Sequence, residues 1–169
     1  MFFVGIKVAG FYAGFVFVFW CLGVAHGALE FSSVVAWDGE TGGLVRTGSG
    51  KELRVDMPVD FGGKGRYACP DEVFLASVGG CLLTTFLFIR RKMHIHLKSL
   101  RITVRGTVEP LGPEGFRVTK IRAHMDVVVG EGEGTLGDRC AELTRDYCHI
   151  SRTLEDAIKL EVSWTVEER

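Results

Sequence analysis

Two cysteines, Cys81 and Cys148, stand in sequence surroundings that suit thiol chemistry. Cys81 lies in the run PDEVFLASVGGCLLTTFLFIRRK, which is charged only at its two ends, and Cys148 opens the stretch CHISRTLEDAIK. The thiolate is the nucleophilic form of cysteine, and two thiols that meet can cycle through a sulfenic acid and a disulfide. This chemistry needs no metal or organic cofactor. If the fold brings the two side chains together, the chain therefore holds a redox-active pair.

The other cysteines and the paired histidines do not indicate a second site. Cys21, Cys69 and Cys140 are expected to be small buried hydrophobes, although Cys69 could compete as a disulfide partner. Five cysteines without zinc or CxxC spacing indicate free thiols in a reducing compartment. His94 and His96 form an HxH pair with no carboxylate or cysteine nearby, which is usually polar surface. Neither a metal nor a cofactor is expected.

Length and charge limit the class of protein. A chain of 169 residues suits one domain that buries roughly 70% of the surface of its unfolded form. Twenty lysine and arginine residues stand against 21 acidic residues, without a long basic stripe. Nucleic acid is not an expected partner, because a protein that follows a phosphate backbone needs such a stripe.

The first 28 residues differ from the rest in composition. Between Lys7 and Glu30 no side chain is charged, and Val8 to Ala25 is mostly large and apolar. Residues 1–28 fit a membrane anchor, a signal peptide or an overlong start equally well. The folded domain is expected at residues 29–169. A cytoplasmic location is predicted, with export or membrane association as the alternative if the segment acts as a signal or anchor.

Three short strands are predicted at the start of this domain. Residues 29–37 suit a strand, and the turn formers of DGETGG, residues 38–43, predict a hairpin after it. Alternation in KELRVDMP, residues 51–58, predicts a third strand of the same sheet. Residues 60–70 are rich in glycine and predict a loop, placed where it could form a wall of an active site.

A long helix is predicted around Cys81. Pro70 suits its first turn, and Asp71 and Glu72 place negative charge near the positive end of its dipole. Residues 73–89 carry no charge, so this helix must be surrounded on every side by protein or by lipid. A domain of this size has difficulty covering such a helix alone. A homodimer that packs two of these helices together is therefore expected.

Two longer strands are predicted after the helix. Period-two alternation after His94 predicts a half-exposed antiparallel strand, and Phe116 to Val129 predicts the strand that returns beside it. The apolar phase changes within the second strand, which predicts a β-bulge near Thr119 or Lys120.

The last forty residues are predicted to hold two helices and a strand. Residues 130–138 are expected to form a flexible loop. Helical spacing then predicts two short helices that meet at Cys148, and alternation in KLEVSWTVEE, residues 159–168, predicts a final strand. The resulting fold class is α+β.

The segment PDEVFLASVGGC, followed 67 residues later by the cysteine of CHIS, resembles the osmotically inducible protein C and organic hydroperoxide resistance (OsmC/Ohr) family. The resemblance covers about Leu29 to Glu167. It implies antiparallel sheets, a long buried central helix that carries Cys81, and an intertwined homodimer with two active sites at its interface. It also implies an enzyme that reduces organic hydroperoxides or hydrogen peroxide, with an external dithiol as reductant and no cofactor.

The resemblance also implies roles for four residues. Cys81 would be the peroxidatic cysteine, which becomes a sulfenic acid, and Cys148 the resolving cysteine, which condenses with it to a disulfide. The acidic residue that the family has ten positions before the first cysteine falls on Asp71, with Glu72 beside it. Because Cys148 begins a helix, it is also expected to gain from the helix dipole.

Three features depart from the family pattern. The first is the shorter aspartate at Asp71, which leaves open whether Asp71 or Glu72 reaches the site. Members with peroxidase activity supply an arginine from the region before the motif, and here Arg66 is the first candidate and Arg46 the second. Such a cation would have to overcome the effect of burial on the Cys81 thiol, with Asp71 or Glu72 holding it. His149 replaces a common proline and could tune Cys148 or face solvent. If neither arginine reaches Cys81, a non-catalytic small-molecule-binding or redox-sensing domain is the alternative.

Overall fold

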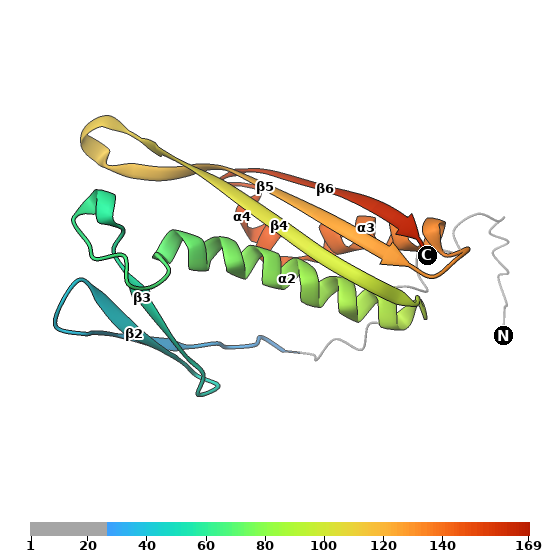
Figure 1. Cartoon of the computed structure of the whole chain (residues 1–169), viewed down its shortest axis with the longest axis horizontal. Helices are drawn as coiled ribbons and strands as arrows, with labels where there is room; N and C mark the ends of the chain where they lie inside the picture. Colours follow the sequence, from blue (N-terminus) through green and yellow to red (C-terminus); the bar gives the residue numbers. More distant parts are fainter. Residues whose placement is uncertain (1–26) are drawn as a thin grey trace, which may run out of the picture.

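The computed structural model describes residues 27–169, so the interpretations of the first 26 residues lie outside the described part. The fold consists of two three-stranded sheets and the helices that lie on the second of them (Figure 1). The principal elements in chain order are β1 (Ser33–Trp37), β2 (Gly42–Thr47), β3 (Glu52–Asp56), α2 (Pro70–Lys92), β4 (Leu97–Pro110), β5 (Phe116–Val129), α3 (Gly134–Tyr147), α4 (His149–Leu154) and β6 (Lys159–Glu168).

The first sheet is the predicted hairpin with its third strand. β1 pairs antiparallel with β2, and β2 with β3. Figure 1 shows this sheet as a separate unit near the start of α2. Val35, Val45 and Leu53 stand side by side on one face of it, and Trp37 continues that face. Val35 is 63% exposed and Trp37 75%, so no part of residues 27–169 covers this apolar face.

The second sheet has the strand order β4-β5-β6 and carries the core on one face. Alternate residues of β5 are buried under the helices, namely Ile121, Ala123, Met125, Val127 and Val129. β4 and β5 are antiparallel, as predicted, but β6 runs parallel to β5. The expectation of antiparallel sheets is therefore wrong at this ladder. The reason is that α3 and α4 carry the chain back across the sheet before β6 begins.

The predicted β-bulge lies in β5. Thr107 faces Lys120 while the next residue, Val108, faces Val118, so Thr119 is the extra residue. This extra residue explains why the apolar positions shift from even to odd numbers along the strand, because one added residue turns the following side chains to the other face.

The long helix α2 lies along the second sheet and carries Cys81. Gly79 permits its close approach to β4, because a Cβ atom at this position would lie 3.1 Å from Cγ2 of Val104. α2 is long and apolar enough to cross a membrane, but core helices of folded domains share that property. In one chain it is buried on one side only: Leu83 and Leu87 are each more than a third exposed.

The region after β5 differs from its prediction. Residues 130–138 were expected to form a loop, but α3 begins at Gly134. Burial accounts for the difference, since Gly137 lies against Val129 and Val166 with no room for a Cβ atom. The predicted junction of two helices at Cys148 is confirmed.

Candidate functional site

Cys81 of α2 and Cys148 at the start of α4 belong to one buried cluster. Cys81 is 6% exposed and Cys148 is fully buried, and both are free thiols. Their neighbours are apolar side chains of α2, the sheet and α4, among them Val78, Leu82, Ile121 and Ala123. The fold therefore brings together the two cysteines that the sequence singled out.

The chain bends sharply at Cys148. This residue follows the last turn of α3 and precedes the first residue of α4, and its backbone is extended, with φ −66° and ψ 106°. Its amide still donates to the carbonyl of Thr144, and its own carbonyl accepts from Arg152. This break between two helices turns the next side chain, His149, toward α2.

The imidazole of His149 lies against the thiol of Cys81. The Cys81 Sγ atom is 3.6 Å from Nδ1 of His149 and 3.9 Å from Nε2, both within reach of a sulfur hydrogen bond. Although His149 as a residue is exposed, its ring has no hydrogen bond to any other group in residues 27–169. Sequence reasoning left this residue open between tuning Cys148 and facing solvent; the structure places its ring on Cys81.

Burial controls the ionisation of Cys148. Loss of water around the sulfur raises the pKa of Cys148, and the neighbouring Cys81 thiol raises it further. Hydrogen bonding from Ser151 acts in the opposite direction but is weaker. The expected benefit from the helix start is thus smaller than the effect of burial, which favours the neutral thiol. α4 has six residues, so its dipole is short.

Arg66 lies in a cluster of carboxylates beside the first sheet. Its guanidinium donates to Asp38, Glu40 and Asp56 at 2.7, 2.7 and 2.8 Å. Hydrogen bonds from Arg66 hold the pKa of the Asp56 carboxyl well below its usual range. The second candidate, Arg46, pairs with Glu52 on the exposed side of the same sheet. Within one chain, as far as residues 27–169 show, neither arginine contacts Cys81.

Asp71 and Glu72 lie at the start of α2, far from Cys81 of their own chain. A rise of 1.5 Å per residue places Asp71 about 15 Å and Glu72 about 14 Å from Cys81 along the helix axis. The carboxylate of Glu72 accepts the backbone N–H of Cys69 at 2.8 Å, so it caps the helix. Asp71 is exposed.

The other two described cysteines are separate from this site. Cys140 is fully buried in the neighbouring core cluster, where burial raises the pKa of its thiol to about 12. Cys69 precedes α2 by one residue, about 18 Å from Cys81 along the helix. A disulfide between Cys69 and Cys81 of one chain is excluded by that distance. Cys21 lies outside the described residues.

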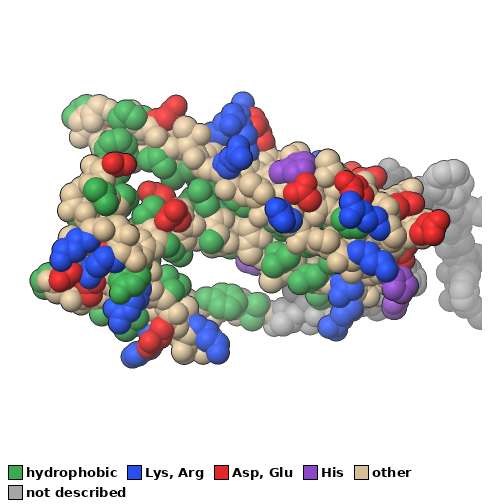
Figure 2. Space-filling view, viewed as in Figure 1, with side chains coloured by type: hydrophobic (Ala, Val, Ile, Leu, Met, Phe, Trp, Pro, Cys, Tyr) green, Lys and Arg blue, Asp and Glu red, His purple; other side chains and the backbone are tan. Residues whose placement is uncertain are grey.

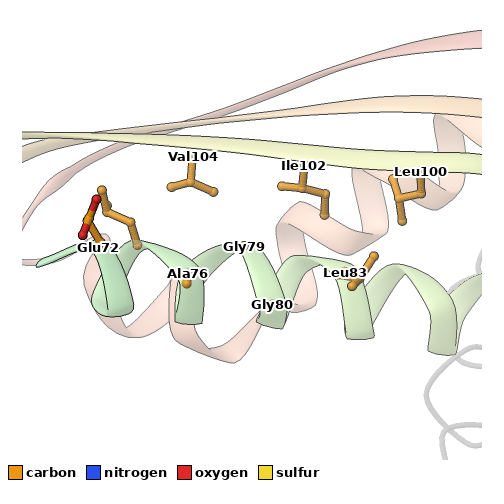
Figure 3. A pocket seen from close by; sticks show the side chains of 9 residues that line it. Glu72, Ala76, Gly79, Gly80, Leu83, Leu100, Ile102 and Val104 are labelled. Carbon is orange, nitrogen blue, oxygen red and sulfur yellow. The ribbon is translucent and has the colours of Figure 1, made fainter. Parts of the chain in front are cut away.

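A groove of about 430 Å³ runs along the other side of α2, between this helix and β4 (Figure 3). Its lining is apolar apart from one carboxylate, and consists of Glu72, Leu75, Ala76, Gly79, Gly80, Leu83, Leu100, Ile102 and Val104. Figure 3 shows the side chains of β4 and α2 that point into it. Cys81 does not line the groove, so it is not the route to the thiol in one chain.

Neither histidine of the HxH pair lies in a cluster that could hold a metal. The ring of His96 pairs with the Glu133 carboxylate at 3.0 Å, and His94 is exposed. Between residues 27 and 169 no group of three or more histidine, cysteine or acidic side chains could hold a metal ion.

Known proteins share this fold. The family model described as OsmC-like protein matches residues 63–163. An organic hydroperoxide resistance protein of Elizabethkingia anophelis is 16% identical with a TM-score of 0.68, over 85% of this chain and 100% of that one. The organic hydroperoxide resistance protein OsmC of Legionella pneumophila is 18% identical with a TM-score of 0.63, over 82% and 98%.

A further solved structure, a hypothetical protein of Aquifex aeolicus VF5, is 20% identical with a TM-score of 0.69, over 84% of this chain and 99% of that one. Identities at this level show a common fold and nothing finer. No curated protein matches the chain.

Proposed function

The chain belongs to the OsmC-like protein family, and from this premise we propose that it is an enzyme that reduces organic hydroperoxides through Cys81 and Cys148. The observation that carries the proposal is the position of both thiols in one buried cluster, with the ring of His149 on the first of them. Two proteins of the same fold are named organic hydroperoxide resistance proteins, which supports the substrate class.

The surroundings of the two thiols support different roles. Cys81 has a basic side chain within hydrogen-bonding distance and retains a small exposed surface, so it is the thiol that meets the peroxide. Cys148 is fully buried and its pKa is raised, so at neutral pH it remains a thiol. A protonated thiol does not attack peroxide, so Cys148 reacts only with the sulfenic sulfur of oxidised Cys81 and gives its proton to the hydroxide that leaves.

The proposed reaction has two steps on the protein. The Cys81 thiolate attacks one peroxide oxygen, so that an S–O bond forms, the O–O bond breaks and the alkoxide takes a proton to leave as an alcohol. Cys148 then attacks the sulfenic sulfur, forms the S–S bond and releases water. Two electrons pass from the cysteines to the peroxide, and an external dithiol returns them by reducing the disulfide.

The apolar surroundings favour an organic peroxide over hydrogen peroxide. Phe74 packs against the cluster of Cys81, and Phe88, almost half exposed, lies about two turns after Cys81 along α2. An alkyl or aryl substituent that covers such surface gains about 25 cal/mol per Å² of apolar area removed from water. Hydrogen peroxide has no substituent that could gain from this contact.

We also propose that the active form is a homodimer, because residues 27–169 of one chain leave two apolar surfaces uncovered. On α2 the small residues Ala76, Gly80 and Thr84 follow one another at intervals of four, with Leu83 and Leu87 beside them. A Cβ atom at Gly80 would meet nothing within 4 Å, so another helix has room to approach there. The apolar face of the first sheet is the second surface, and Figure 2 shows hydrophobic side chains at that end.

A dimer of this kind would also explain the distant carboxylates. In two antiparallel copies of α2 that cross near residue 76, Asp71 of the partner subunit lies level with Cys81. At 100° per residue, Asp71 is about 80° from Cys81 around the helix, whereas Glu72 is about 180° away. Since Glu72 already caps the helix, Asp71 is the carboxylate that we assign to the neighbouring site. Arg66 would reach a thiol only across the same interface.

A redox-sensing domain is the second candidate function. The observation that favours it is the enclosure of Arg66 by three carboxylates, which removes the expected cation from Cys81. A sensor would form the disulfide in response to peroxide but would not turn over. Multiple turnovers in the presence of dithiol distinguish an enzyme from a sensor.

The test is consumption of cumene hydroperoxide and of hydrogen peroxide in the presence of excess dithiothreitol. The wild type is expected to turn over many times and to prefer cumene hydroperoxide. Cys81→Ser is expected to be inactive, and Cys148→Ser to lose dithiol-dependent turnover after a single oxidation. An inactive wild type, or full turnover by Cys81→Ser, would overturn the proposal.

Cys69→Ser is the matched control for the loss of a cysteine. It removes a thiol that lies outside the Cys81 cluster of its own chain and places a favourable capping residue at the start of α2. Its turnover should equal that of the wild type. A large loss in this variant would mean that a thiol at the helix start takes part in the reaction.

A further inference from the structure

We infer that His149 is the catalytic base that activates Cys81, in place of the arginine that the sequence led us to expect. The inference rests on the proposed function for its biological meaning, but thiol reactivity tests it without any peroxide. Both ring nitrogens of His149 lie within 4 Å of the Cys81 Sγ atom. A neutral imidazole at this distance can take the thiol proton, and the imidazolium that results stabilises the thiolate beside it.

The groups that face Cys81 leave this role to His149. The sheet presents apolar side chains to the cluster, such as Val104 and Ile121, and α4 adds the neutral thiol of Cys148. On α2 itself, the hydroxyl of Thr84 donates to the backbone carbonyl of Cys81 and not to its sulfur. In the described part of the chain, His149 is the one basic side chain in hydrogen-bonding contact with this thiol.

The position of the ring suits proton transfer better than a purely structural role. A histidine that only fills space in a core is buried and is held by further hydrogen bonds. His149 instead lies at the surface, has Cys81 as its side-chain partner and can exchange protons with water. The sulfur of Cys81 is therefore shielded from water, while the imidazole beside it is open to solvent.

The proton follows a closed path in the proposed reaction. His149 accepts the proton of the Cys81 thiol, and the thiolate attacks the peroxide. The imidazolium then gives the same proton to the alkoxide that leaves, so an alcohol departs and His149 returns to its neutral form.

Proline is an informative substitution at this position. His149 is the first residue of α4, where a missing backbone N–H costs nothing, and Cys148 before it already has the extended backbone that precedes proline well. His149→Pro thus removes the imidazole and retains the helix start. His149→Gln is a second variant that keeps a polar side chain of similar size without a basic nitrogen.

The experiment measures the rate at which iodoacetamide alkylates Cys81 in the fully reduced protein between pH 5.5 and 9.5, with peptide mass spectrometry to identify the site. A free thiol near its usual pKa is only a few per cent thiolate at pH 7, so we expect His149→Pro and His149→Gln to react roughly tenfold more slowly than the wild type there. The rates should converge at the alkaline end. Equal rates at pH 7 would overturn the inference.

Rescue with free imidazole separates a chemical role from a structural one. In His149→Ala, imidazole in the buffer should restore part of the lost rate at pH 7, and its effect should disappear in Cys81→Ser. His94→Asn is the control, because it removes an exposed histidine while asparagine tolerates the left-handed backbone found there. It should react at the wild-type rate, and no rescue of His149→Ala at any imidazole concentration would contradict the inference.

Peroxide turnover, measured on the same variants, distinguishes the two proposals. If the His149 variants are alkylated slowly but the wild type does not reduce peroxide, the proposed peroxidase activity is contradicted. The activation of Cys81 by His149 is then still supported. An active wild type with unchanged turnover and alkylation in His149→Pro would contradict the role of His149 and leave the peroxidase in place.

Discussion

Nε of Arg66 lies 2.8 Å from Oδ2 of Asp56, whose side chain is completely buried beside the first sheet. Asp38 and Glu40 hold the other two nitrogens of the same guanidinium. The residue expected to activate a thiol is thus, within one chain, the centre of an ionic cluster that ties the loop after β3 to the turn between β1 and β2.

Asp56→Asn is expected to lower the melting temperature and to change its dependence on pH. Because the folded pKa of Asp56 lies below the unfolded value of about 3.9, its contribution to stability is complete above that value and is lost as pH falls toward the folded one. Thermal unfolding of wild type and variant at a fixed protein concentration, from pH 3 to 7, measures the difference in melting temperature. The gap between wild type and variant should narrow below about pH 4; a gap independent of pH would contradict the assignment.

Gly80→Leu is expected to weaken the dimer without unfolding the chain. No atom of residues 27–169 lies within 4 Å of a Cβ atom at this position, so a leucine has room in the described part of one chain and has a better helix propensity. In the proposed dimer it would keep the two helices apart. We expect at least a tenfold increase in the dissociation constant, measured by light scattering, with an unchanged circular dichroism spectrum.

The matched comparison for this variant is Gly79→Ala, since that Cβ atom would meet Val104 within the chain and should affect stability instead. A wild-type mass near 18.6 kDa, the mass of one chain, at micromolar concentration would reject the dimer.

Much of the fold follows from the sequence where one residue pattern determines one local structure. The bounds of β5 and a bulge near Thr119 or Lys120 were predicted correctly, because alternation and its change of phase are local signals. The parallel pairing of β6 was not, because pairing direction depends on where α3 and α4 return the chain. Likewise, glycines before Gly137 obscured the start of α3, which packing against the sheet stabilises.

The candidate site, too, could be predicted only in part. Cys81 and Cys148 could be selected from their sequence contexts, and their juxtaposition follows from the family fold. The contact of His149 with Cys81 could not be predicted, because it depends on the bend at Cys148 and on the angle at which α4 meets α2. Arg66 stood in the expected region, but its partners come from the turn between β1 and β2 and from the end of β3, which lie far from it in sequence.

Cys69→Ser is expected to stabilise the protein slightly. Cys69 occupies the position before the first residue of α2, where a serine hydroxyl accepts the free N–H groups of the helix better than a thiol does. The gain should be about 0.5 to 1 kcal/mol in the free energy of unfolding, measured by urea denaturation. A loss of similar size would show that the Cys69 side chain has packing contacts that serine cannot replace.

Cys140 is expected to be the least reactive described thiol in the native protein. Its pKa of about 12 leaves very little thiolate at pH 8.5, and its sulfur is held near the carbonyl of Phe86 in the core. Iodoacetamide should therefore modify Cys81 rapidly at this pH and Cys140 only after denaturant is added. Mass spectrometry of the peptides distinguishes the two, and modification of Cys140 as fast as Cys81 without denaturant would contradict its burial.

The most direct test of the central claim, that Cys81 and Cys148 form one redox pair, is to treat the fully reduced protein with one equivalent of cumene hydroperoxide. The remaining thiols are then alkylated and the peptides mapped under non-reducing conditions. The predicted result is a single disulfide-linked peptide pair that contains Cys81 and Cys148 of one chain and that dithiothreitol separates. Alkylation of both Cys81 and Cys148, or a disulfide that joins Cys81 to any other cysteine, would contradict it.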